Sequence, residues 1–263
     1  MPSPAEAIKG ILFKSERLTA LLRQLRVLLY YLNGKPHEDD FNFLRHPSLT
    51  SGLLLDLGAN IGQSAISVAA VQPGLQVESI EANPACEPGL RTAAWLLRRR
   101  LHFHYRVVGV GASTGVLGFH VPVRSSRMLL QEGTFDPDSL LTPASVARMG
   151  VRDRDYSVRV ISIPMVTVDS LQLSPRVVKM DLQGLEMDTL RGMAQTLARS
   201  RPVLMIEMGE YQDEILQFLA ALGYARYHWD GARLQTGVRT DTLNAIFIAD
   251  GDPLKPTLAA AQE

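Results

Sequence analysis

The sequence is poor in cysteine and carries no excess of charge of either sign. Cys86 is its single cysteine, so one chain can form neither a disulfide framework nor a zinc site built from cysteines. Lysines and arginines together number 27, and so do aspartates and glutamates. This balance gives no support to non-specific binding of nucleic acid. The scarcity of cysteine favours a reducing compartment, and we expect a cytoplasmic protein.

Long hydrophobic runs are also missing. The most apolar early run, residues 27–32, lies between Arg26 and Lys35 and is far shorter than a membrane span. Glu6 and Lys9 stand where a secretory signal would need an apolar segment. We therefore expect no membrane span and no signal peptide. A length of 263 residues with 46% apolar residues is typical of one globular domain with a small addition.

Leucines at helical spacing predict an N-terminal helix over about residues 5–32. Arginines lie between these leucines, and the sequence Asn-Gly-Lys-Pro at residues 33–36 is a stop signal. The leucine side of this helix has four interpretations. It packs on its own domain, forms a homodimer interface, covers the active site as a lid, or lies on a membrane surface.

Strand-like and helix-like segments alternate from residue 52 onwards. Repeated βα units of this kind predict an α/β fold, with a mostly parallel sheet and helices on both of its faces. Strands are expected at residues 53–57, 75–80, 103–110, 177–182, 203–208, 224–229 and 242–248, and helices at residues 61–70, 84–100, 183–200 and 213–222.

The region between residues 111 and 168 interrupts this alternation. It contains two hairpin-like stretches, residues 116–123 and 157–164, joined by a polar connector. Because loops at strand ends build the sites of α/β folds, we expect the insertion at residues 124–160 to face the acceptor, the molecule on which the protein acts. The resulting division is a helical extension at residues 1–40, a main domain at residues 41–252 and a loose tail at residues 253–263.

The stretch LLLDLGANIG, residues 53–62, reads as a strand, a glycine-rich turn and the start of a helix. Such a turn exposes helix N–H groups, and glycine lets a ligand approach the backbone. The turn lacks the Gly-Lys-Ser/Thr of a P-loop, which argues against a nucleoside triphosphate. Asn60 stands where a dinucleotide-binding fold has its second glycine. A side chain there argues against a pyrophosphate, and so against an NAD-dependent oxidoreductase, the alternative function.

An acid follows the second strand at the distance expected of a ribose ligand. Glu81 lies close to the roughly 20 residues beyond Gly58 that such an acid requires, and a carboxylate can accept hydrogen bonds from both ribose hydroxyls. The structural alternative is that Glu81 caps the helix that begins at Pro84. The end of the third strand, at Val110 and Gly111, offers a backbone edge for an adenine.

Six blocks of the sequence then resemble, in order, the FkbM-type S-adenosylmethionine-dependent methyltransferases. They are LLLDLGANIGQSA, IEANP, VVGVGAS, VTVDSL, VVKMDLQGLEMDTLRG and RPVLMIEMGE, and the resemblance runs from about residue 41 to residue 249. It implies a Rossmann-like class I methyltransferase with a seven-stranded sheet. It also implies S-adenosyl-L-methionine as cofactor, S-adenosyl-L-homocysteine as product, and methylation mostly of hydroxyl oxygens in sugars and other natural products.

Carried over by position, the resemblance assigns a cofactor site at the strand ends. The turn of Gly58, Asn60 and Gly62 would lie under the methionine part of the cofactor, with Asp56 beneath it near the ammonium group. The other residues implied are Glu81 for the ribose with Asn83 nearby, Val110 and Gly111 beside the adenine, and Asp181 facing the methyl group.

Methyl transfer to a hydroxyl requires that a base remove a proton. The candidate bases are Asp181, Glu186 and Glu207, which follow two neighbouring strands, and His120 in the hairpin. Ser125, Ser126 and Arg127 are candidates for binding polar groups of the acceptor. We predict no metal ion, although the three acids could hold one.

The family commonly reads Asp-x-Glu-Gly-x-Glu after the fourth strand, whereas the middle acid is here Gln183. The site therefore has one charge fewer than the family pattern. This departure is the only hint of the third hypothesis, a non-catalytic module that binds S-adenosylmethionine.

Overall fold

The computed structural model describes residues 16–124, 127–129, 133–142, 156–208, 212–237 and 244–255. Its helices are α2 (Glu16–Asn33), α3 (Gln63–Val71), α4 (Glu87–Leu97), α6 (Glu186–Arg191), α7 (Ala194–Ser200) and α8 (Gln212–Ala221). The main sheet contains β1 (Gly52–Leu57), β2 (Leu75–Glu81), β3 (His102–Val107), β8 (Pro175–Met180), β9 (Val203–Glu207), β10 (Tyr224–Trp229), β11 (Leu234–Thr236) and β12 (Asn244–Ala249).

The main sheet has the strand order β11-β10-β12-β9-β8-β1-β2-β3. Strands β9, β8, β1, β2 and β3 pair in parallel, and β12 and β10 extend this sheet by antiparallel pairing. The prediction of a mostly parallel Rossmann-like sheet is confirmed. The expected seven strands are present, and the eighth is the short β11, which forms a hairpin with β10. Asp230 stabilises the connecting turn by accepting hydrogen bonds from the backbone N–H groups of Ala232 and Arg233.

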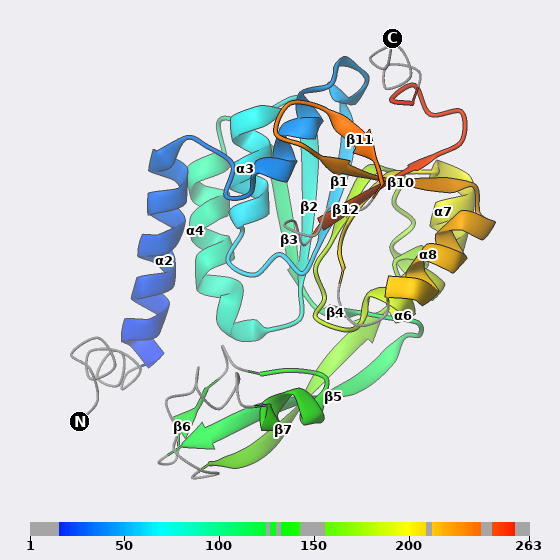
Figure 1. Ribbon diagram of the computed structural model, residues 1–263. Helices are drawn as coiled ribbons and strands as arrows, with labels where there is room; N and C mark the ends of the chain where they lie inside the picture. Colours follow the sequence, from blue (N-terminus) through cyan, green and yellow to red (C-terminus); the bar gives the residue numbers. More distant parts are fainter. Residues whose placement is uncertain are drawn as a thin grey trace.

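Helices cover both faces of this sheet (Figure 1). Helices α2, α3 and α4 lie on one side of the sheet and α6, α7 and α8 on the other. The side chains of β1 show why: Leu54 belongs to the core on the side of α3 and α4, whereas Leu55 and Leu57 belong to the core on the other side. An apolar run buried on both faces is typical of a central parallel strand.

A second sheet lies beyond the ends of the main strands, at the bottom of Figure 1. It contains β4 (Gly109–Val110), β5 (Gly115–Arg124), β6 (Arg127–Met128) and β7 (Ser157–Val166), in the order β4-β7-β5-β6. The antiparallel pairing of β5 with β7 matches the hairpin expected from the sequence.

The strand expected at residues 103–110 is in fact two strands in two sheets. β3 pairs with β2 in the main sheet, whereas β4 pairs with β7 in the second sheet. At the junction, Val108 donates its backbone N–H to the carbonyl oxygen of Glu81 over 2.9 Å. The chain therefore changes sheets beside the end of β2, and this brings the second sheet to the rim where Glu81 lies.

Helix α2 packs against α4 and, less extensively, against α3. Val27 is fully buried, whereas the exposed side of α2 carries leucines: Leu21, Leu22, Leu25, Leu28, Leu29 and Leu32. The first interpretation of this helix, packing on its own domain, therefore describes one of its sides. The part of the chain that the structure describes contains no helix long and apolar enough to cross a membrane.

Candidate active site

The glycine turn after β1 is a close contact between two strand ends. Gly58 has φ +83°, and a Cβ atom built on it would lie 1.8 Å from the carbonyl oxygen of Asp181, which follows β8. Its backbone N–H donates to the carbonyl oxygen of Ile80 over 2.9 Å. Only glycine fits this conformation without displacing the neighbouring backbone. The turn thus fixes the ends of β1, β2 and β8 relative to one another.

Glu81 lies at the end of β2 and is clamped by the backbone. One oxygen of its carboxylate accepts the N–H of Asn60 and the other accepts the N–H of Asn83, each over 2.7 Å. Burial raises the pKa of Glu81, although the two backbone hydrogen bonds oppose this rise. A carboxylate oxygen has two lone pairs, so each oxygen retains the capacity to accept a second hydrogen bond.

Asn60 adopts φ +50°, in the left-handed region that asparagine tolerates better than most residues. This conformation directs its N–H at Glu81, while its side-chain Oδ1 lies 3.5 Å from the Cys86 thiol, which donates to it. Burial raises the pKa of Cys86 to about 12, so the thiol stays protonated. Asn83 caps the short helix η3 (Pro84–Cys86) by accepting the N–H of Ala85.

The turn and Glu81 border a cavity of about 460 Å³. Four parts of the fold contribute to it: helix α2, the ends of the main strands, the loop after β8 and the second sheet. Its lining residues include Leu22, Arg23, Arg26, Gly58, Asn60, Ile61, Glu81, Asn83, Cys86, Val108, Val110, Phe119, Thr134, Phe135, Asp181, Gln183 and Leu185. Phe119 of β5 and Phe135 of the segment after β6 form an edge-to-face pair with ring centroids 4.9 Å apart, which gives the cavity an aromatic wall.

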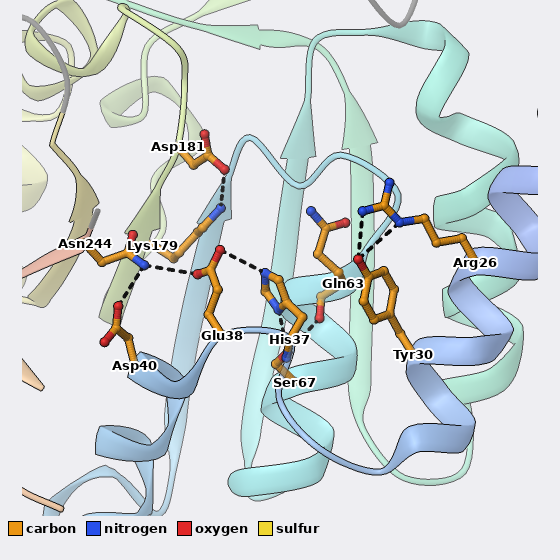
Figure 2. A network of polar contacts seen from close by, with 10 residues as sticks. All are labelled: Arg26, Tyr30, His37, Glu38, Asp40, Gln63, Ser67, Lys179, Asp181 and Asn244. Carbon is orange, nitrogen blue, oxygen red and sulfur yellow. Dashed lines mark hydrogen bonds and ion pairs between the residues drawn. The ribbon is translucent and has the colours of Figure 1, made fainter. Parts of the chain in front are cut away.

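Asp181 stands at the rim of this cavity and belongs to a network of charged groups (Figure 2). Nζ of the buried Lys179 donates to its Oδ2 over 3.1 Å. Burial acts to raise the pKa of Asp181, but the attraction of Lys179 and hydrogen bonds from Glu207 and Lys179 together lower it. The hydrogen bond with Asp181 is in turn the main cause that raises the pKa of Glu207 to about 8. These opposite shifts favour an ionised Asp181 beside a protonated Glu207 near neutral pH.

The network continues into the segment that follows α2. Glu38 is linked to His37, and Asn244 of β12 donates to Glu38 and to Asp40 over 3.1 and 3.0 Å, as Figure 2 shows. The hydrogen bond from His37 is the main cause that lowers the pKa of Glu38. This segment thereby places a second carboxylate near Lys179.

Residues 56–225, more than half of the chain, match the sequence model of the methyltransferase FkbM domain. The chain belongs to the FkbM methyltransferase family. This membership favours methyl transfer over the oxidoreductase that the glycine turn left as an alternative. A search of curated proteins gave no match.

Several solved structures resemble this FkbM chain. Methyltransferase FkbM from Methylobacillus flagellatus KT has 17% identity and a TM-score of 0.46, and the match covers 93% of this chain and 60% of that one. Precorrin-6y C5,15-methyltransferase from Geobacter metallireducens GS-15 has 12% identity over 80% and 84% of the two chains, with a TM-score of 0.40. Fibrillarin from Aeropyrum pernix, in complex with S-adenosyl-L-methionine, has 12% identity over 90% and 74%, with a TM-score of 0.38.

Two residues expected at the cofactor site, Asp56 and Gly62, lie beneath the turn and do not line the cavity. Asp56 is fully buried under the turn, where it accepts a hydrogen bond from Ser79 over 2.7 Å. Burial is the main cause that raises its pKa. Gly62 has φ +93° and begins α3, and a Cβ atom there would lie 2.8 Å from that of Ala93 in α4. Both residues support the turn from below.

Of the two residues expected beside an adenine, Val110 lines the cavity and Gly111 does not. The carbonyl oxygen of Val110 accepts a hydrogen bond from Thr189 of α6 over 3.4 Å. Gly111 is buried against the helix layer, and a Cβ atom on Gly192 would lie 2.0 Å from its carbonyl oxygen. The edge available to an adenine is therefore at Val110 and its neighbour Val108.

The family motif after β8 is built around Glu186. Its two carboxylate oxygens accept the backbone N–H groups of Leu182 and Gly184 over 2.8 and 2.9 Å. The side chain is buried and closes the loop on itself, which makes it a poor candidate for the base. Gln183 lines the cavity with φ +51°, so the position where the family commonly has an acid does face the site.

Of the hairpin residues that the sequence suggested, the structure places the side chain of His120 alone. Side chains alternate along β5, and Phe119 lines the cavity while His120 does not. Ser125 and Ser126 lie outside the described residues. Arg127 begins β6, where its backbone pairs with that of Arg124.

A lid over the active site is one of the interpretations that the sequence allows for the N-terminal helix, but its pattern does not point to the arginines of α2 as site residues. Leu22, which belongs to the leucine pattern, lines the cavity together with Arg23 and Arg26, which do not belong to it. Their spacing of three and four residues is the signal that places them on one face. Within the described part of the chain, no group of three histidine, cysteine, aspartate or glutamate side chains could hold a metal ion.

Proposed function

We propose that the chain is an S-adenosylmethionine-dependent methyltransferase that methylates a hydroxyl oxygen of a small molecule, a sugar or a secondary metabolite. The observation that carries this proposal is the clamped carboxylate of Glu81, which lines the same cavity as Gly58 and Asn60 of the glycine turn. Family membership supports the same reaction class.

The residues around the turn fit this cofactor. Gly58 and Asn60 of the turn line the cavity, and Glu81 retains acceptor capacity for two ribose hydroxyls. Val108 and Val110 offer an apolar edge to an adenine. When bound, S-adenosylmethionine supplies an electrophilic methyl group on its sulfonium.

The base that we assign is the carboxyl pair of Asp181 and Glu207. Asp181 lines the cavity, and its carboxylate can accept the proton of an acceptor hydroxyl. Glu207, whose pKa is about 8, is protonated near neutral pH and donates a hydrogen bond to Asp181, so Asp181 is the ionised member of the pair that takes the proton. The buried Lys179 keeps Asp181 ionised until the hydroxyl arrives.

The acceptor side of the cavity is the aromatic wall. Phe119, Phe135 and Leu185 exclude water and offer a face on which an apolar or carbohydrate ring can pack. The zero formal charge of the chain supports a small molecule over nucleic acid, and its single cysteine supports a cytoplasmic location.

The exposed leucines of α2 support a homodimer. Leu21, Leu29 and Leu32 each expose more than half of their side chains, with values of 58%, 58% and 68%. A second copy of the helix would cover them. Leu29→Glu should convert a dimer to a monomer in light scattering, and a wild-type monomer would contradict this proposal.

Calorimetry tests the central proposal. The chain should bind S-adenosylhomocysteine and S-adenosylmethionine but not NAD. Asp181→Asn should still bind S-adenosylhomocysteine, yet fail to transfer a labelled methyl group to any hydroxylated acceptor that the wild type methylates. Absence of binding by the wild type would refute the proposal. Full activity of Asp181→Asn would refute only the assignment of the base.

A further inference from the structure

The cavity contains two cationic side chains that pair with no acid among the described residues. Arg23 and Arg26 both line it from α2, and neither forms an ion pair with a described carboxylate. The other charged lining groups are the carboxylates of Glu81 and Asp181. One end of the cavity is therefore suited to an anionic group of its ligand.

Both guanidinium groups are held by contacts that leave donors available. Arg23 donates from one terminal nitrogen to the carbonyl oxygen of Ala85. Arg26 donates from Nε and one terminal nitrogen to the hydroxyl oxygen of Tyr30, over 3.1 and 2.9 Å. A guanidinium has five N–H donors, so each arginine can still form a forked pair with a carboxylate. The fully buried Val27 fixes the helix that carries them.

The position of Arg23 relates this pair to the cofactor side of the cavity. Ala85, its partner, lies in the short helix η3, two residues beyond Asn83, whose N–H donates to Glu81. The aromatic wall belongs to a different part of the fold, the second sheet and the segment after β6. This contact places Arg23 beside the acid assigned to the ribose rather than at the aromatic wall, and Arg26 lies three residues further along the same helix.

We propose that Arg23 and Arg26 bind the carboxylate of the methionine part of S-adenosylmethionine, so that α2 completes the cofactor site. This inference rests on the proposed function. The ammonium and sulfonium groups of that cofactor are positive and suit the acids of the cavity, while its carboxylate is the one anionic group and requires donors. In this proposal α2 covers the cavity as a lid and also supplies side chains that bind the cofactor.

Two ligands that differ only in this carboxylate test the inference. They are S-adenosylhomocysteine and its decarboxylated analogue, measured by calorimetry against the wild type and the variants Arg23→Gln, Arg26→Gln and Arg26→Lys. The wild type should bind the analogue about tenfold or more weakly than S-adenosylhomocysteine. Each glutamine variant should lose a similar factor for S-adenosylhomocysteine and little for the analogue. Arg26→Lys should retain part of the preference.

Arg99→Gln is the matched control, since Arg99 is an exposed arginine beyond the end of α4 and does not line the cavity. It should bind both ligands as the wild type does. Thermal melting of each variant checks that α2 remains folded.

The outcomes separate this inference from the proposed function. If the glutamine variants lose equal affinity for both ligands, or lose none for either, the proposed role of the arginines is wrong. Binding of S-adenosylhomocysteine by the wild type would still support the proposed cofactor. If the glutamine variants bind both ligands normally but lose only an anionic acceptor, the cation pair serves the acceptor and the inference is wrong. Failure of the wild type to bind S-adenosylhomocysteine would instead refute the proposed function itself.

Discussion

Nζ of Lys179 lies 3.1 Å from Oδ2 of Asp181, and the charges of Asp56 and Glu38 also act on this buried lysine. Burial acts to lower the pKa of Lys179, but the charges of Asp56 and Asp181 outweigh this and raise it. Lys179→Met removes the cation and leaves these carboxylates without their shared partner. We expect a loss of about 3–5 kcal/mol in the free energy of unfolding, measured by urea denaturation.

The same substitution should also shift to higher pH the range in which the base is ionised. Without Lys179 the pKa of Asp181 rises, so methyl transfer should reach its plateau at a higher pH than in the wild type. Lys255→Met is the control, because Lys255 pairs with the exposed Asp250 at the surface. A Lys179→Met variant as stable as this control would show that the buried lysine does not hold the network together.

The pair of Asp181 and Glu207 predicts how stability depends on pH. The pKa of Glu207 is about 8 in the folded chain, chiefly because of its hydrogen bond with Asp181, and about 4.3 in an unfolded chain. Between these values the folded state holds the extra proton, so its stability falls as pH rises. Glu207→Gln cannot titrate and should flatten the curve of unfolding free energy between about pH 5 and pH 8.

The lowered pKa of Asp181 makes the free energy of unfolding rise with pH, but only in the acidic range. The stability that it contributes is present above that range, so it does not change the slope between about pH 5 and pH 8. Glu214→Gln makes the same chemical change on the exposed side of α8 and should leave the slope intact. Identical slopes for Glu207→Gln and the wild type would mean that Glu207 is not protonated beside Asp181 near neutral pH.

Much of the fold could be predicted from local sequence. The apolar runs of β1, β8 and β9 indicated strands buried on both faces, and the turn after β1 followed from its glycines. Glu81 was identified by its distance along the chain from Gly58. These features depend on neighbours in the sequence or on one parallel pairing, which periodicity encodes.

The remaining parts depend on contacts that periodicity does not encode. Whether Phe119 or His120 faces the cavity depends on which face of the second sheet turns toward the main strands. The loop after β8 gave no sign that Glu186 would accept N–H groups from its own loop. Arg23 reaches Ala85 from 62 residues away, a tertiary contact that no window of sequence contains.

The clamp on Glu81 predicts a loss of cofactor affinity on Glu81→Gln. Both carboxylate oxygens accept backbone N–H groups, so an amide nitrogen must face one of these donors and the turn at Asn60 should shift. We expect S-adenosylhomocysteine to bind about 10- to 100-fold more weakly, measured by calorimetry. Glu78→Gln alters the same strand at an exposed pair with Arg106 and should bind normally. Unchanged affinity of Glu81→Gln would remove Glu81 from the ribose site.

The contact at Gly58 predicts that Gly58→Ala damages both stability and the site. The new methyl group would need the space 1.8 Å from the carbonyl oxygen of Asp181, so the end of β8 must move. Strain at φ +83° adds to this clash, and we expect a loss of at least about 3 kcal/mol in urea denaturation. Gly184→Ala is the matched control, with φ +107° but open space around it, and strain alone should cost about 1–3 kcal/mol. If the two variants lose equal stability, the contact between the ends of β1 and β8 is not what requires glycine at this turn.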